Sequence, residues 1–200
     1  MSTAQPIRSN DELNLFKEFY LNNRPNVRNY ALICIGLNSA LRISDVLQLR
    51  WEDVYDFKNE HFLKHIIIIE KKTNKETRIA INDNIKQGLG MYMDSLYNIK
   101  KCDYIFNGQK KGKPLSRSQA FRIIKKAANE LHMESGISCH SMRKTFGYYA
   151  WKCGTPPAIL MDIYNHSSYE ITMPAGHRSH PGKQRPAGRP DFPLCRHLPS

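Results

Sequence analysis

One β-branched run interrupts a chain that is otherwise patterned for helices, and this contrast limits the fold more than any other feature. The run is Ile66-Ile67-Ile68-Ile69, and the alternating stretch 78–81 follows it after a polar, lysine-rich segment. Two stretches of this kind around a polar loop predict a β-hairpin, with the isoleucine run as a buried strand. Because helical spacing dominates elsewhere, the expected fold is mainly α with a small antiparallel β-sheet (α+β).

Apolar residues at helical spacing, bounded by capping residues, predict the helices around this hairpin. Ser9 and Glu12 form a capping-box pattern, and Pro25 suits the first turn of the next helix. A short third helix is expected with Ser44 as its cap and Arg42 in the turn before it. Later helices are expected from Asn82 or Asp83, from Ser116 or Ser118 through 119–132, from about His140 to Cys153, and from 155 to 164.

The helix expected over 119–132 is amphipathic. Its apolar residues should pack inward, and its cations should face solvent. The residues expected inside are Phe121, Ile123, Ile124 and Ala128, and those expected outside are Arg122, Lys125 and Lys126.

The composition changes abruptly at Pro174. Residues 174–200 hold six of the eleven prolines and almost no apolar periodicity. Such a segment cannot bury enough apolar surface to offset the entropy of ordering it. We therefore expect one domain over residues 1–173 and a disordered tail over 174–200. The tail also holds metal-ligand types without a scaffold, so no metal site is expected. These residues are His177, His180, Cys195 and His197.

The net charge of +12 indicates a polyanionic partner. The tail contributes five basic residues and one acidic residue, so the rest of the chain keeps a charge of +8. A basic surface concentrates near phosphates and releases counterions on contact. The charge therefore favours nucleic-acid binding, although a basic protein without such a partner has the same composition.

Cysteine usage and the absence of targeting signals predict a cytoplasmic location. The five cysteines are scattered and never form a Cys-x-x-Cys pair, which favours free thiols in a reducing compartment. The N-terminal residues lack the pattern of a secretory signal, and no apolar run is long enough to cross a bilayer.

The stretch 136–154 contains the first pair of candidate functional residues. His140 and Arg143 are three residues apart, so their side chains lie close together at the start of the expected helix. An imidazole can move a proton, and a guanidinium can bind two oxygens of an anion. A solvated or capping pair remains the alternative. The apolar residues expected to face inward are Met142, Phe146, Tyr149, Ala150 and Cys153.

Arg42 is a second candidate, because a side chain in a turn can point into a cleft. Asp45 follows three residues later, where its carboxylate suits the first helical turn and can orient the arginine. An ordinary surface arginine remains the alternative reading.

Two lysine-rich loops are candidates for contacts with the DNA backbone. The hairpin loop carries Lys71, Lys72 and Lys75, which can equally protect an edge strand from aggregation. The loop 100–114 carries Lys110, Lys111 and Lys113 next to glycine. A solvated loop has the same composition, so neither loop is decisive alone.

Taken in their order along the chain, these motifs resemble those of the tyrosine recombinases, or phage integrase family, over roughly residues 7–173. Residues 41–53, which include Arg42, are similar to the family's first box. The sequence His-Ser-Met-Arg at 140–143 is similar to the second box. The sequence Asn-His-Ser-Ser at 165–168 resembles the motif that completes the pocket.

This resemblance implies a role for each matching residue. Arg42 and Arg143 would bind the scissile phosphate, and Lys72 would protonate the leaving 5′ oxygen, with Lys71 and Lys75 as near alternatives. His140 would transfer a proton, and His166 would complete the pocket. The implied substrate is duplex DNA, which is cleaved and rejoined without a metal or nucleotide cofactor. Family members act on DNA as tetramers.

The sequence departs from the family at the nucleophile. The family spacing puts the nucleophilic tyrosine about nine residues after His166, near Ala175, but no tyrosine occurs from 170 to 200. Tyr164 and Tyr169 do not have that spacing. We therefore expect a chain that binds DNA without cleaving it, with a tail that is a frameshift product, a scar or a degenerated end. The alternative is a non-catalytic double-stranded DNA-binding module on the same scaffold.

The family's separate N-terminal clamping domain has no counterpart before the first box. The chain is therefore expected to be either a catalytic domain from a longer protein or a small single-domain recombinase. Because the segment that family members exchange is replaced, a monomer is expected in solution.

Overall fold

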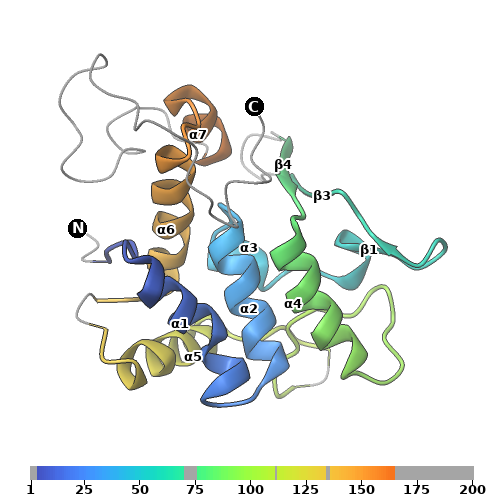
Figure 1. The fold of residues 1–200 in the computed structure, drawn as a ribbon. Coiled ribbons are helices and arrows are strands. Elements are labelled where there is room, and N and C mark those ends of the chain that lie inside the picture. The colour runs from blue at the N-terminus through green and yellow to red at the C-terminus, as the bar shows by residue number, and fades with distance from the viewer. Residues whose placement is uncertain (1–3, 70–75, 111, 134–135, 165–200) are drawn as a thin grey trace.

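The computed structural model describes residues 4–69, 76–110, 112–133 and 136–164. The helices are α1 (Asn10–Asn22), α2 (Val27–Asn38), α3 (Ile43–Val46), the 3-10 turn η1 (Trp51–Asp53), α4 (Asp83–Asp94), α5 (Arg117–Glu130), α6 (Cys139–Lys152) and α7 (Pro157–Tyr164). The strands are β1 (Tyr55–Asp56), β2 (His61–Phe62), β3 (His65–Ile69) and β4 (Glu76–Ala80). The predicted fold class is confirmed: helices dominate, with small antiparallel sheets beside them (Figure 1).

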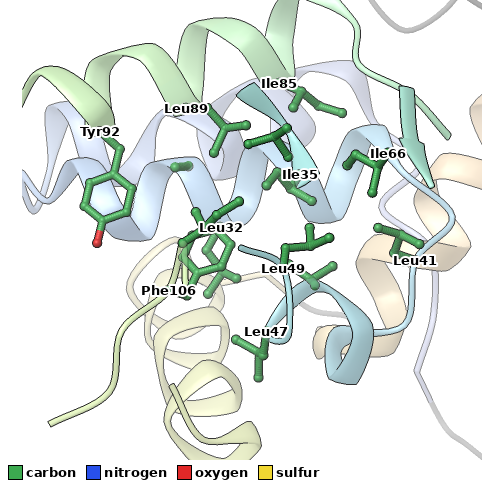
Figure 2. Packing of buried hydrophobic residues seen from close by; sticks show 14 of the residues in the cluster. Leu32, Ile35, Leu41, Leu47, Leu49, Ile66, Ile85, Leu89, Tyr92 and Phe106 are labelled. Atoms are coloured by element: carbon green, nitrogen blue, oxygen red, sulfur yellow. The ribbon is translucent and has the colours of Figure 1, made fainter. Parts of the chain in front are cut away.

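The second helix is the centre of the core. Ten of its twelve residues are buried, so it must be covered on nearly every side. Helices α1, α4 and α6 pack against it (Figure 1). Figure 2 shows Leu32 and Ile35 of α2 meeting Ile85 and Leu89 of α4. This central helix ends just before Arg42, so it fixes the position of that residue.

Helices α2 and α4 approach each other closely at Gly88. A Cβ atom built on Gly88 would lie 2.8 Å from Cys34 Cβ and 3.3 Å from Ala31 Cα. These distances are shorter than van der Waals contact, so only glycine fits without a shift of the helices.

The predicted hairpin is confirmed, but its first strand is not buried throughout. Strand β3 pairs antiparallel with β4, with Ile66 opposite Ile79. Because side chains alternate along a strand, Ile66 is buried whereas Ile67 and Ile69 are 51% and 62% exposed. The expectation of a buried strand was therefore wrong for half of the isoleucine run. A second pair of strands, β1 and β2, was not predicted.

The helix starts agree with the capping residues in most cases. Ser9, Asn82 and Ser116 each accept a hydrogen bond from the first turn of their helices. The second helix is capped by Asn26 instead of beginning at Pro25. Arg42, rather than Ser44, occupies the N-cap position of α3.

The face of α5 differs from the prediction at Phe121 and at Lys125, which was expected to face solvent but is only partly exposed. Its buried residues are Ala120, Ile124, Ala127 and Ala128, and Ile123 is partly buried. Phe121, which was expected inside, is 47% exposed. With about 100° between successive residues, position 121 falls to one side of the buried arc.

The cysteine prediction is confirmed for Cys34, Cys102 and Cys139, which are free thiols. It is wrong for Cys153, which is disulfide-bonded. Cys153 caps the end of α6 and is only partly buried. In the described part of the chain, no helix combines the length and apolar character needed to cross a membrane.

Candidate active site

Arg42 is presented by the turn that follows α2. Ser39 is the C-cap of α2, and its Oγ donates a hydrogen bond to the carbonyl of Ile35 at 2.7 Å. Leu41, in the turn that follows, is buried. Arg42 is extended, with φ −71° and ψ 146°, and its side chain is exposed. Among the described residues, no hydrogen bond or ion pair engages its guanidinium. Its donors are therefore available for an anion.

Asp45 does not hold Arg42 in the way that the sequence suggested. Its carboxylate accepts a hydrogen bond from Ser44 Oγ at 3.3 Å, and within the described ranges no ion pair joins it to Arg42. Its negative charge acts on Arg143 instead, where it opposes part of the lowering of the pKa that burial causes. Asp45 therefore offsets part of the positive charge between the two arginines.

Arg143 is the most constrained cation of this region. It lies on the first turns of α6 and is only 8% exposed. Its guanidinium donates from one terminal nitrogen to the carbonyl of Ala40 and from the other to the carbonyl of Tyr164 at 3.0 Å. It also lies 4.6 Å from the centroid of the Tyr164 ring. These contacts join the turn after α2, α6 and the end of α7.

Burial lowers the pKa of Arg143, and the nearby charge of Arg42 lowers it further. A guanidinium remains charged in spite of such a shift, because its ordinary pKa is far above neutral. Two carbonyls occupy only two of its five N–H donors, so donors remain for a bound anion.

Arg42 and Arg143 line the same cavity, which has a volume of about 790 Å³. Two arginines a hundred positions apart in the sequence therefore line one cavity. The cavity is also bounded by the hairpin, through Ile69 and Thr77, and by the start of α5, through Arg117. Its other polar lining residues are Ser44, Asp45, Gln48, Asp53, Ser116 and Tyr164.

His140 lies at the exposed start of α6, whose cap is Ser138. It is not among the residues that line the cavity, but the charges of Arg42 and Arg143, which do line it, act on its ring. Partial burial is the main cause that lowers its pKa, followed by the charges of Lys144, Arg143 and Arg42. The imidazole is therefore neutral near pH 7 and can accept a proton.

Several predicted site residues lie outside the described residues: Lys71, Lys72, Lys75, Lys111, His166 and Ala175. Lys110 and Lys113 are described and exposed, and neither lines the cavity. They belong to a loop that a bridge between Asn107 and Pro114 closes. Pro114 itself lines the cavity, so this loop leads directly into it.

The structure adds Arg117 and Tyr164 to the cavity. Arg117 was not predicted as a site residue, although Ser116, directly before it, was one of the two caps expected for this helix. Tyr164 is buried, and its hydroxyl donates to the carbonyl of Arg143 at 2.5 Å. Burial raises the pKa of this phenol, so it acts as a structural group and is a poor nucleophile.

Comparisons with known proteins agree with this geometry. A sequence profile described as the phage integrase family matches residues 8–177. The Bacillus subtilis protein named "Probable integrase/recombinase YoeC" is 39% identical over 173 residues, which cover 86% of this chain and 89% of that protein. Several other curated tyrosine recombinases are covered over about half of their length, from 46% to 56%.

Two solved structures have a similar fold. The crystal structure of XerA recombinase has a TM-score of 0.68 and 20% identity, covering 84% of this chain and 59% of that chain. The Tn1549 transposon integrase in complex with transposon right end DNA has a TM-score of 0.65 and 20% identity, covering 84% and 60%.

Proposed function

The chain belongs to the phage integrase family, and from this membership we propose that its catalytic domain carries the site for cleaving and rejoining duplex DNA through a phosphotyrosyl intermediate. The observation that carries the proposal is the cavity shared by Arg42 and Arg143. A phosphodiester under attack gains negative charge on its non-bridging oxygens, and two guanidinium groups can stabilise that charge.

The two arginines are suited to different parts of this task. Arg143 is held by two main-chain carbonyls, so its remaining donors are already oriented before DNA binds. Arg42 is exposed and can adjust to the incoming phosphate. Removing one such donor from a preorganised site typically slows a reaction by about 10²–10³-fold.

His140 fits a proton-transfer role beside this phosphate. Its pKa is lowered, so the neutral ring is the main form near pH 7 and can accept a proton from an attacking hydroxyl. Asp45 supports the pair of arginines by offsetting charge at Arg143.

We assign the remaining roles from the matching motifs. Lys72 would protonate the leaving 5′ oxygen, and His166 would complete the phosphate pocket. The ends of strands β3 and β4 line the cavity through Ile69 and Thr77, which is consistent with a hairpin lysine acting there. Lys71, Lys75, Lys110, Lys111 and Lys113 would contact the DNA backbone.

The missing nucleophile leads to a second part of the proposal: this chain binds DNA but forms no covalent intermediate. No tyrosine follows Tyr169 in the sequence, and Ala175 occupies the expected position. Residues 174–200 are proposed to be a foreign or degenerated tail, and residues 1–173 the recombinase domain. Sequencing the source gene tests this, and a native reading frame that encodes the same tail would contradict it.

Salt-dependent binding to duplex DNA tests the first part. Affinity for a fluorescent duplex of random sequence should fall steeply with salt, and Arg42→Ala should reduce the slope of log affinity against log salt by about 1. Arg24→Ala is the matched control, because Arg24 is exposed, pairs with Glu130 at 3.1 Å and lies outside the cavity. Affinity that does not change with salt would contradict the proposal.

Covalent trapping separates a damaged enzyme from a binding module. The tail is replaced by the corresponding segment of the Bacillus subtilis relative, with tyrosine at position 175 or, as the control, phenylalanine. Nicked duplexes selected for binding serve as substrates. A protein–DNA adduct from the tyrosine graft alone supports the enzyme, whereas no adduct from either graft supports the non-catalytic alternative. The original chain should give no adduct.

A further inference from the structure

Three asparagine side chains join the end of α2 to the start of α4. Asn38 is the last residue of α2, and its Oδ1 accepts hydrogen bonds from Asn82 Nδ2 at 2.9 Å and from Asn84 Nδ2 at 3.1 Å. Asn82 is the N-cap of α4, and Asn84 lies in the first turn of that helix. The two helices lie side by side (Figure 1), and these hydrogen bonds tie them together at one end of their contact.

The amide groups of this network have one orientation that fits their partners. Asn38 Nδ2 donates to the carbonyl of Cys34 at 2.9 Å, and a carbonyl can only accept, so the oxygen of Asn38 must face α4. Asn82 Oδ1 accepts from the backbone N–H of Ile85 at 3.0 Å, so its nitrogen must face Asn38. Asn38 and Asn82 are 4% and 8% exposed. A shift of either helix would leave a buried polar group without its partner, so the network favours one relative position of the two helices.

Each side of this network leads directly to a wall of the cavity. On the α2 side, only the turn 39–41 separates Asn38 from Arg42. On the α4 side, Asn82 closely follows strand β4, whose Thr77 lines the cavity together with Arg42. The hydrogen bonds of Asn38 therefore connect the turn that presents Arg42 to the base of the hairpin.

The direction of the Arg42 side chain depends on how this turn is held. Among the described residues, no hydrogen bond or ion pair engages the guanidinium of Arg42. One side of the turn is held by Arg143, which donates to the carbonyl of Ala40. Asn38 holds the other side, towards the hairpin. Resting on the proposed function, we infer that Asn38 is a positioning residue, whose hydrogen bonds to the start of α4 hold the turn so that Arg42 points at the bound phosphate.

A double-mutant cycle on DNA affinity tests this role. Asn38→Ala should weaken binding to a fluorescent duplex at least about twofold, and it should have no effect when Arg42→Ala is already present. A substitution that only lowers the folded fraction weakens binding by the same factor in both backgrounds. Loss of the effect in the Arg42→Ala background therefore distinguishes positioning from stability.

Ser39→Ala is the matched control. Ser39 is fully buried at the same helix end, and its hydroxyl donates to the carbonyl of Ile35 within α2 at 2.7 Å. This variant removes a buried hydrogen bond but keeps the connection to α4. Any change in affinity that it causes should therefore be the same with Arg42 and with Arg42→Ala.

Asn82→Ser breaks the connection from the other side. Serine also caps a helix, but its shorter side chain does not reach Asn38. This variant should reproduce the effect of Asn38→Ala. Thermal unfolding checks that every variant is folded at the assay temperature, and if Asn38→Ala does not fold, Asn82→Ser decides by the same criteria.

The contrary results separate the inference from the proposed function. If Arg42→Ala reduces the salt slope but Asn38→Ala leaves affinity unchanged, or lowers it by the same factor in both backgrounds, the inference is wrong and the proposed function stands. The inference is also wrong if Ser39→Ala depends on Arg42 as strongly as Asn38→Ala does. If Arg42→Ala does not change the salt dependence, the proposed function fails, and the inference fails with it.

Discussion

Arg42 and Arg143 carry the same charge into one cavity but are held in opposite ways. Arg143 is buried and bonded to two carbonyls, whereas Arg42 is exposed and, among the described residues, unbonded. Lysine at position 143 would keep the charge but lose the planar fork and the contact with the Tyr164 ring.

Arg143→Lys should therefore destabilise the protein by about 1–3 kcal/mol, because buried carbonyl groups lose their partners. Arg42→Lys should change stability by less than about 0.5 kcal/mol, as expected for a surface substitution. Urea unfolding of both variants measures the difference. Equal stabilities would show that the contacts of Arg143 contribute nothing to the fold.

His140 should make DNA affinity depend on pH. Burial and three neighbouring cations lower its pKa in the free protein, and a bound phosphate would raise it again. DNA binding should then take up a proton, so affinity should increase as the pH falls below about 7 and stay level above it. His140→Gln should reduce this dependence, measured as the slope of log affinity against pH. The same slope in both proteins would contradict the prediction.

At the level of single residues, the sequence predicted features that depend on residues close together in the chain. The boxes around Arg42 and Arg143 identified two residues that share a cavity. The hydrogen bond from Tyr164 to Arg143 joins residues twenty-one positions apart, and no local pattern specifies such a contact. The spacing of Asp45 allowed it to orient Arg42, but short sequence spacing fixes neither the rotamer nor the partner of a side chain.

Among the elements, the α2–α4 contact depends on a missing side chain at Gly88. Gly88→Ala should be less stable than Gly90→Ala by about 1–3 kcal/mol, because its methyl overlaps Cys34 Cβ at 2.8 Å. Gly90 is the matched control on the same helix: its added methyl would lie 3.9 Å from Phe62 and gains the same helix propensity. Thermal unfolding of the two variants is the measurement. If Gly88→Ala is as stable as Gly90→Ala, the helices can separate without cost.

The positions of the helices and strands were more predictable than which of their residues would be buried. Capping residues located α1, α4 and α5 because the cap is a local hydrogen bond. The exposure of Ile67 and Ile69 could not be read from a uniform isoleucine run, since four identical residues carry no alternation. Phe121 was placed inside because it is apolar, yet its angular position on α5 favours solvent.

For the whole molecule, charge and the distribution of apolar surface predict a monomer in the absence of DNA. The net charge of +12 makes two copies repel each other. Among the described residues, exposed large apolar side chains such as Leu15, Tyr97 and Phe121 lie on different segments, and the two that share a strand, Ile67 and Ile69, line the cavity. Light scattering at several salt concentrations should give the mass of one chain. A stable dimer or tetramer without DNA would contradict this prediction.

The hydrogen bonds of Arg143 also make the last turn of α7 part of the cavity that Arg42 and Arg143 line. One donor of its guanidinium is occupied by the main chain of Tyr164, and the Tyr164 hydroxyl returns a bond to the main chain of Arg143. These two hydrogen bonds couple the position of Tyr164 to that of Arg143. A displacement of Tyr164 would therefore move the guanidinium of Arg143 with it, so the end of α7 helps to set how this cation is presented to the cavity.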